Sequence, residues 1–460
     1  MTGGNFLKKN TSDNNSFFFT VFTLVFPMAM QNLINVAVNG ADVLMLGKLG
    51  DTMLAGSSLA GQIQYIMTLI FFGLTSGSSV LAAQYWGKGD TDTIEKILAI
   101  ALRFSLVTAA VFTFLSFVFP VQCVSLFSKD KAVIEEGAKY LRILSLSYIM
   151  TSVTMIYLNI MRSVERVMIS TFVYLTSLLC NIFFNWVFIF GNLGCKPLGI
   201  CGAALATCIA RMFELIITIV YSVFKSTPVH FRFSYLFKKE KILFGDFIKY
   251  ALPVTLNELA WGTGCAMNTL IIGHLGESAA AANSVAQVVR QLATVVAFGI
   301  ANATAIMMGK AMGANQTEKA EEYSKKFIKL TVIVGAAACL LVLAVRPFIL
   351  KFVNISEQSA DYLSIQLLIM SYFVWAQAFN TTMVVGVFRA GGDTRFGLIM
   401  DISTMWGCSI LFGAVCAFVL KLSVPVVYVV IMSDEVIKIA FSILRYRSKK
   451  WLRNVTRDKI

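Results

Sequence analysis

Long stretches of apolar residues cover most of the chain, and short groups of charged residues, glycine or proline separate them. Residues 97–119 and 332–345 are typical of these stretches. A helix that crosses the hydrocarbon core of a membrane needs roughly 20 apolar residues. Unbroken runs are not the alternating pattern of an outer-membrane barrel. The pattern predicts twelve membrane-spanning helices, over residues 17–46, 53–84, 93–119, 132–160, 167–191, 199–224, 244–273, 278–309, 317–345, 358–388, 396–420 and 424–444.

The composition of the 460-residue chain supports this prediction. Hydrophobic residues make up 57% of the chain and charged residues 14%, with a mean hydropathy of +0.74. So few polar residues could not cover the surface of a soluble protein of this size. The composition therefore excludes a soluble enzyme, a fibrous protein and a disordered scaffold, and makes the lipid bilayer an expected partner.

The net charge of +14 comes from basic residues whose distribution along the chain indicates the membrane topology. Basic residues are scattered between apolar helices, so they form no surface typical of nucleic-acid binding. The first apolar stretch, which begins near Phe17, is not followed by a small-residue cleavage site. We therefore expect that it is not removed as a signal peptide and remains as the first helix. Most Lys and Arg residues in loops fall on the side that holds both termini. The positive-inside rule then predicts a multi-pass protein of the cell (inner) membrane with both termini in the cytoplasm.

The two halves of the chain repeat. Pro27 and Pro253 are separated by 226 residues, and the same spacing relates Gly47-Lys-Leu-Gly50 to Gly273-His-Leu-Gly276. Six helices per half return the chain to its starting side, so the repeat is parallel. We expect an N-lobe at 1–224, a basic cytoplasmic linker at 225–242, a C-lobe at 243–444 and a basic cytoplasmic tail at 445–460. Rocking of such lobes would give alternating access to a site near the middle of the membrane.

Polar residues within the N-lobe helices are candidates for ion coupling, because each is costly in lipid unless paired or hydrated. Gln31, Asn35, Asn39 and Asp42 recur at steps of four, four and three, which puts them on one helix face. A carboxylate among amide oxygens can hold a proton or a hard cation. The fifth helix adds Ser177, Asn181 and Asn185, which could instead serve only as interhelical hydrogen-bond partners. Asp42 could also simply cap its helix.

The seventh helix carries a second polar face, formed by Glu258, Trp261, Cys265 and Asn268. An acid beside an aromatic ring suits a cationic amphipathic ligand, through charge pairing and cation–π contact. The alternative is that Glu258 forms a structural pair with Arg290 of the eighth helix. Both arrangements could occur in different states.

The remaining ionisable groups favour structural roles. Arg211 and Glu214 in the sixth helix are spaced for a local ion pair, as are the twelfth-helix residues Asp434 and Glu435 with Lys438; Asp401 has a weaker claim to function. Nine cysteines form no Cys-x-x-Cys pair, although Cys195 and Cys201 share a loop and could be bridged. With only two histidines, a metal centre is not expected. No nucleotide-binding or hydrolase motif occurs, so we expect no enzyme and no cofactor, and an ion gradient as the energy source.

Several motifs in chain order resemble the multidrug and toxic compound extrusion (MATE) transporters of the bacterial DinF-like branch. They are Asn39-Gly-Ala-Asp42, Gly47-Lys-Leu-Gly50, Gln84-Tyr-Trp-Gly-Lys-Gly89, Gly202-Ala-Ala-Leu-Ala-Thr207, Glu258-Leu-Ala-Trp261 and Arg389-Ala-Gly-Gly-Asp393. The resemblance covers nearly the whole chain. It implies an all-α polytopic fold of two six-helix bundles in a V shape, which would export organic cations, including drugs, in exchange for inward H⁺ or Na⁺. We expect a monomer.

The resemblance also assigns residues. Asp42 matches the first-helix acid implicated in coupling, Asn181 matches the asparagine beside it, and Glu258 matches a seventh-helix acid of many members. Asn185 departs from the pattern, since many relatives carry Asp there. The expected coupling residues are Asp42, Asn39, Asn35, Asn181, Asn185 and Thr207, with Na⁺, if used, at Asp42 and Asn181. The expected substrate-binding residues are Glu258, Trp261, Asn257, Asn268, Gln31 and Arg290.

Two questions stay open from the sequence. One carboxylate in the N-lobe fits proton loading better than a highly charged Na⁺ site, but amide oxygens can also bind Na⁺. A lipid-linked saccharide flippase of the same superfamily is the alternative function. Such proteins often have fourteen helices and a cationic cavity, whereas this chain predicts twelve helices and acidic cavity residues.

Overall fold

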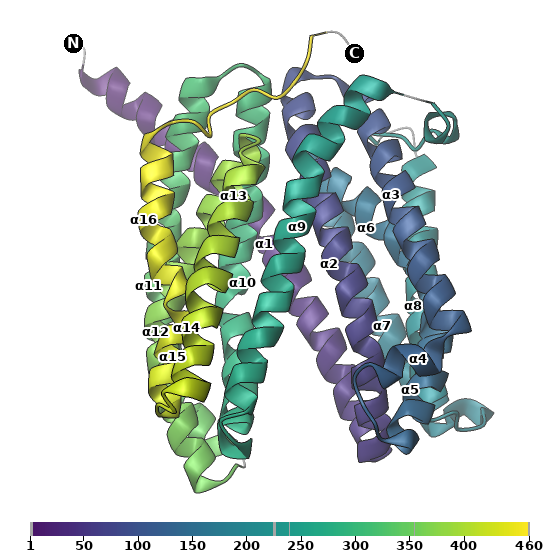
Figure 1. The fold of residues 1–460 in the computed structure, drawn as a ribbon. Helices are drawn as coiled ribbons and strands as arrows, with labels where there is room; N and C mark the ends of the chain where they lie inside the picture. Colours follow the sequence, from purple (N-terminus) through teal and green to yellow (C-terminus); the bar gives the residue numbers. More distant parts are fainter. Residues whose placement is uncertain (1–2, 224–226, 239, 354, 459–460) are drawn as a thin grey trace. The chain divides into compact units, whose positions relative to one another are not determined.

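The structure, a computed structural model, describes residues 3–223, 227–238, 240–353 and 355–458, with side chains described from Phe17 onward. These residues form helices joined by short connections, without a strand among them (Figure 1). The helices of the first half, in chain order, are α1 Gly3–Gly47, α2 Asp51–Lys88, α3 Thr91–Val118, α4 Pro120–Ser125, α5 Lys131–Leu144, α6 Ser147–Ser163, α7 Val167–Phe190, η1 Asn192–Gly194 and α8 Ile200–Val223.

The second half starts with the short helix η2 in the linker and continues with longer helices, several of which contain π-helical segments. They are η2 Phe233–Leu236, α9 Lys241–Gly273, α10 Glu277–Gly313, α11 Thr317–Phe352, α12 Glu357–Thr381, η3 Thr382–Phe388, α13 Thr394–Asp401, η4 Ile402–Ile410, α14 Leu411–Ala414, η5 Val415–Val419, α15 Val424–Met432 and α16 Asp434–Arg447.

Each of the twelve predicted spans has a helical counterpart. By length and composition, nine described helices could cross a membrane, or ten if α5 and α6 form one span bent by 53°. The predicted span 132–160 is therefore not one straight helix. The span 396–420 contains the π-helical segments η4 and η5, and the span 424–444 is broken at Ser433.

Glycines end the first helix of each half and confirm the sequence repeat locally. Gly50, before α2, has φ 111°, and Gly276, before α10, has φ 126°. Only glycine adopts such values without strain. The two Gly-x-Leu-Gly motifs thus form the same reversal between a long helix and the next.

The chain divides into two compact units. Unit 1 comprises residues 1–30 and 263–454, and unit 2 comprises residues 31–262 and 455–460. Two of the three divisions fall inside α1 and α9, three or more residues beyond the prolines Pro27 and Pro253 that these helices contain, and the third falls after Asn454 in the tail. The expected lobes 1–224 and 243–444 follow helix order, whereas the compact units exchange the first part of α1 and of α9.

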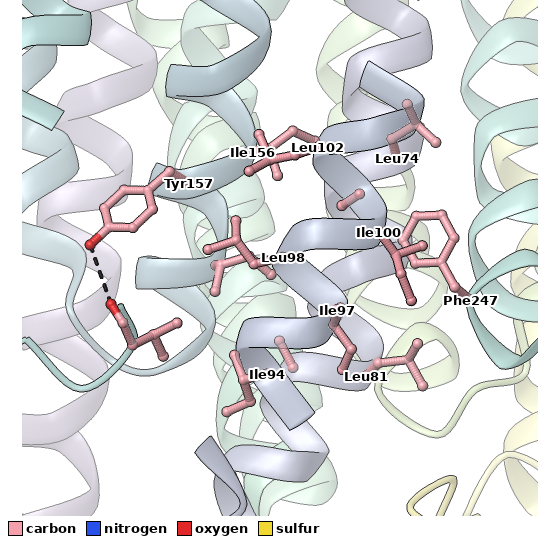
Figure 2. Packing of buried hydrophobic residues seen from close by; sticks show 14 of the residues in the cluster. Leu74, Leu81, Ile94, Ile97, Leu98, Ile100, Leu102, Ile156, Tyr157 and Phe247 are labelled. Atoms are coloured by element: carbon pink, nitrogen blue, oxygen red, sulfur yellow. Dashed lines mark hydrogen bonds between the residues drawn. The ribbon is translucent and has the colours of Figure 1, made fainter. Parts of the chain in front are cut away.

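Close helix packing holds unit 2 together. Figure 2 shows part of its core, to which Leu98 of α3, Ile156 of α6 and Phe247 of α9 belong. A Cβ atom on Gly73 of α2 would lie 2.2 Å from the Cα of Thr255 of α9, and one on Gly77 would lie 2.3 Å from the Cα of Ala251. Small residues allow helix backbones in a membrane to approach this closely.

The described part of the linker is bound to the start of α3. The buried carboxylate of Glu95 accepts a hydrogen bond from the backbone N–H of His230 at 2.9 Å and pairs with the Arg232 Nε at 2.7 Å. The Tyr235 hydroxyl donates to Asp92 at 2.5 Å. This hydrogen bond raises the pKa of Tyr235. The linker residues 227–238 are therefore an ordered part of unit 2.

The C-terminal tail has contacts of its own in each unit. In unit 1, Trp451 is buried, stacks on Tyr446 and has its carbonyl against Gly391. In unit 2, the Arg457 guanidinium binds Asp246 with two hydrogen bonds, at 2.5 and 2.8 Å. The basic tail is thus anchored at both ends of its short length.

Candidate functional site

Three polar side chains from α1 and α7 form a connected group in unit 2. The Asn185 Nδ2 donates to the Asp42 Oδ1 at 2.6 Å and to the Asn181 Oδ1 at 3.1 Å. The Asn181 Nδ2 in turn donates to the Thr207 Oγ1 of α8 at 3.3 Å. Asn181 and Asn185 are buried, and Asp42 is partly buried. The structure therefore brings together four of the six expected coupling residues.

The local sequence explains why these four side chains meet. Asn181 and Asn185 are four residues apart on α7, so they lie on one helix face. Gly202 of α8 lets the backbones of α7 and α8 approach, because a Cβ there would lie 2.6 Å from the Phe188 carbonyl oxygen. This approach places the buried Thr207 within reach of Asn181.

Two further residues complete the surroundings of Asp42, and sequence reasoning did not assign them to this site. Tyr140 of α5 is buried, and its hydroxyl interacts with Thr207 and with the charge of Asp42. Arg211 of α8 also acts on Asp42 through its charge, although its Nη1 pairs with Glu214 at 2.5 Å as predicted. Tyr140 could have been suspected only from its place on a strongly amphipathic helix.

The rest of the predicted first-helix face is not part of this group. Gln31 is buried, and its Nε2 donates to the Thr171 hydroxyl at 2.8 Å and to the Val167 carbonyl at 3.3 Å. Asn35 and Asn39 are exposed on α1. Within unit 2, the four residues of this predicted face thus lie in three different environments.

The predicted substrate-binding residues are distributed over both units. Asn257 is buried, and its Oδ1 has no hydrogen-bond partner among the residues that the structure describes. Glu258 and Trp261 are half-buried, and all three belong to unit 2. Asn268 and Arg290 belong to unit 1, where the Arg290 Nη2 donates to the Gln287 Oε1 at 2.6 Å.

Unit 1 contains a second buried polar group, centred on Lys438 of α16. The ammonium lies 3.1 Å from Asp401, 3.0 Å from Asp434 and 4.0 Å from Glu435. The Asn380 Nδ2 donates to the Glu435 Oε2 at 2.9 Å. The ion pair predicted within the twelfth span is confirmed. Sequence reasoning missed that Asp401 and Asn380, from other helices, join it.

Neither group resembles a metal centre. Within the described residues, no group of three or more His, Cys, Asp or Glu side chains could hold a metal ion. The nine cysteines, all in the described ranges, are free, including Cys195 and Cys201.

Apolar membrane helices with buried ionisable groups, repeated in two halves, define the class of polytopic membrane transporters. The MatE family model matches residues 27–187 and matches again at 253–415. The chain therefore belongs to the MATE family of multidrug efflux transporters, which are not enzymes. The two matches reproduce the repeat found in the sequence.

Curated relatives and solved structures agree with this assignment. The chain is 22% identical to the uncharacterized transporter YisQ of Bacillus subtilis, over 95% of each chain, and 23% identical to the probable multidrug resistance protein YoeA of the same species, over 88% of each. A crystal structure of MATE in the bent conformation superposes with a TM-score of 0.85 at 20% identity, covering 94% of both chains. A MOP superfamily transporter from Pyrococcus furiosus gives 0.84 at 20% identity, over 94% of this chain and 95% of the other. These structures identify the MATE fold.

Proposed function

We propose that this protein is a secondary active antiporter that exports cationic amphipathic compounds in exchange for inward protons, by alternating access between its two lobes. The observation that carries the proposal is the 2.6 Å contact between the Asn185 amide and the Asp42 carboxylate, inside a membrane-spanning region. A carboxylate held there by neutral amides can change its protonation state without losing its neighbours.

The hydrogen-bond pattern around Asp42 supports a proton as the coupling ion. The buried Oδ1 of Asn185 has no partner in the described residues. An ionised Asp42 can only accept, but a protonated Asp42 has one O–H to donate. Rotation of the Asn185 amide would then offer this oxygen to the new donor. One carboxylate and three neutral side chains also give Na⁺ less negative charge than a dedicated cation site provides.

The substrate class follows from the acid on α9. Glu258 is half-buried beside Trp261 one turn further on, a combination suited to an organic cation. Asn257 and Gln31, in the same unit as Glu258, would contribute hydrogen bonds and limit the shapes of the compounds that bind. The names of relatives such as YoeA support drugs as substrates.

A lipid-linked saccharide flippase is less well supported. A diphosphate headgroup requires cationic side chains, and the acids Asp42 and Glu258 would repel it. Export of a fluorescent cation such as ethidium from cells, with and without the protein, separates the two functions. Only the antiporter is expected to lower the amount of dye inside cells that contain the protein, compared with cells that lack it.

The coupling ion is tested in proteoliposomes that contain the purified protein and a fluorescent organic cation. A pH gradient and a Na⁺ gradient are imposed separately at the same membrane potential. We expect substrate exchange driven by the pH gradient alone. Exchange driven only by Na⁺ would contradict the proton mechanism, and no exchange under either gradient would contradict antiport.

We further propose that the protein works as a monomer in the cell (inner) membrane, with both termini, the linker and the tail in the cytoplasm. The excess of basic residues in those segments supports this orientation.

A further inference from the structure

The polar group around Lys438 carries more negative charge than its lysine can balance. Asp401, Asp434 and Glu435 are three carboxylates, and Lys438 is the one cation among them. The side chain of Lys438 is 4% exposed and those of Asp401 and Glu435 are each 12% exposed. An uncompensated carboxylate in such surroundings is strongly disfavoured.

Each contributing side chain lies beside an interruption in a membrane helix. Asn380 of α12 precedes the π-helical segment η3, Asp401 of α13 directly precedes η4, and Asp434 follows the break at Ser433 between α15 and α16. Segments of π-helix inside longer helices frequently occur at functional sites. Ser433 lies about halfway along the predicted twelfth span, 424–444, so Asp434 and Glu435 are far from either end of that span.

Asn380 provides independent evidence for a missing hydrogen-bond donor. Its side chain is 4% exposed, and its Nδ2 donates to both the carbonyl and the side chain of Glu435, at 2.6 and 2.9 Å. The Oδ1 of the same planar amide is buried without a partner in the described residues. A buried acceptor without a donor is costly, so a donor is expected there in another state.

We infer that Glu435 is a second proton-binding residue, in unit 1, and that Asn380 senses its protonation by turning its amide. This inference rests on the proposed function. In the ionised state the amide N–H₂ faces the Glu435 carboxylate, as in the structure. In the protonated state the O–H of Glu435 donates to the Asn380 Oδ1. The proton adds to one carboxylate oxygen, and no other bond changes.

A proton explains the arrangement better than a metal ion. The Lys438 ammonium, with its three N–H donors, already lies between Asp401 and Asp434, where a bound cation would otherwise sit. A second cation would be repelled at this distance, whereas a proton neutralises the carboxylate that is farthest from Lys438. Other titratable groups face this region: the charges of Arg290, Asp434 and Lys438 act on Cys265 of α9, and the charge of Arg290 acts on Tyr428 of α15.

The same pairing of one carboxylate with one asparagine amide therefore occurs in both compact units. In unit 2, Asn185 donates to Asp42 and keeps its Oδ1 unpaired; in unit 1, Asn380 donates to Glu435 and keeps its Oδ1 unpaired. The two asparagines are not at equivalent positions of the repeat. Each lobe would thus bind a proton through its own carboxylate and amide.

The test is a titration of the purified protein in detergent, followed by the infrared band of protonated carboxyl groups. Between about pH 6 and pH 9, carboxyl groups in water stay ionised, so only shielded ones contribute. We expect Glu435→Gln and Asp42→Asn each to retain roughly half of the wild-type band, because each removes one of two carboxyl groups, and the double variant to lose it. Glu357→Gln, at an exposed position at the start of α12, is the control and should not change the band.

A full wild-type band in folded Glu435→Gln would overturn the inference, as would complete loss of the band in Asp42→Asn. Displacement of the Glu435 proton by Na⁺ at constant pH would overturn the proton as the ligand. A full band in Asp42→Asn, lost in Glu435→Gln, would support Glu435 and contradict only the proposed role of Asp42.

If Glu435→Gln does not fold, Asn380→Ala in the Asp42→Asn background decides. Hydrogen bonds to a carboxylate are stronger than those to a neutral acid, so their loss should move the remaining titration to higher pH. An unchanged midpoint would overturn the inference.

Discussion

At the residue scale, one asparagine amide donates to each of two carboxylates, Asn185 to Asp42 and Asn380 to Glu435. An amide can donate to an ionised acid or accept from a protonated one, because its two ends differ only in N and O. It therefore fits both protonation states after a half-turn about its Cβ–Cγ bond, which exchanges the two ends. A second carboxylate in the same place would instead change the charge of the group.

Asp42→Asn should leave the protein folded and remove gradient-driven export. The two side chains are nearly the same size, so packing survives, while the group that titrates is lost. Export of a fluorescent cation from proteoliposomes under an imposed pH gradient measures this. Export at the wild-type rate would show that Asp42 does not couple transport to the gradient.

Asn185→Asp should move the pH optimum of transport upward. The Asn185 amide lies 2.6 Å from Asp42, so the substitution puts two carboxylates in contact. Like charges at this distance bind a shared proton more tightly, and its release then needs a higher pH. The initial rate of exchange against pH is the measurement. Asn315→Asp, at an exposed position between α10 and α11 where, within the described residues, only the side-chain oxygen accepts a hydrogen bond, is the control. An unchanged pH profile would mean that the contact of Asn185 with Asp42 serves only to pack the helices.

Glu258→Gln should weaken binding of cationic dyes by about 1 to 3 kcal/mol, the loss expected for a charge-assisted contact, and neutral dyes much less. If Glu258 instead pairs with Arg290, the single variant should be unstable and Glu258→Gln with Arg290→Gln should recover. Dye affinity and thermal stability in detergent, measured for both variants, distinguish these roles. Joint recovery of stability and affinity in the double variant would reject direct recognition by Glu258.

The interruptions in the helices mark the limit of sequence reasoning at the element scale. Twelve helical segments could be predicted, since an apolar run of sufficient length has few other structures in a membrane. The bend between α5 and α6, the π-helical segments and the break at Ser433 could not be predicted. Spans that are apolar on most faces have little hydrophobic periodicity, so a change in hydrogen-bond register is not visible in their sequence. For the same reason, Asp401 and Asn380 could not be connected with Lys438 without the fold.

Gly73→Ala should destabilise the contact between α2 and α9. The added methyl group would lie 2.2 Å from the Thr255 Cα, and a backbone atom cannot move aside as a side chain can. We expect a loss of about 1 to 3 kcal/mol, typical of overpacking. Gly61→Ala on the same helix is the matched control, because nothing lies within 4 Å of that position.

Thermal unfolding in detergent compares the two α2 variants. Gly61→Ala should be neutral or slightly stabilising, since alanine is the better helix former by up to about 1 kcal/mol. Equal melting temperatures for Gly73→Ala and Gly61→Ala would mean that α2 and α9 do not pack as closely as the structure describes.

The orientation of the chain in the membrane belongs to the scale of the whole molecule, and the charge distribution predicts it. Cys195 lies in the connection between α7 and α8 and is exposed, while the other eight cysteines are buried or half-buried. With the N-terminus in the cytoplasm, this connection emerges on the outer side. A membrane-impermeant maleimide applied to intact cells should therefore label the wild-type protein and leave Cys195→Ser largely unlabelled. In the Cys195→Ser background, Ser234→Cys in the linker is the matched inward probe and should react only after the cells are opened. Labelling of this Ser234→Cys variant in intact cells, together with no labelling of Cys195 in the wild-type protein, would reverse the proposed orientation and with it the direction in which protons drive export.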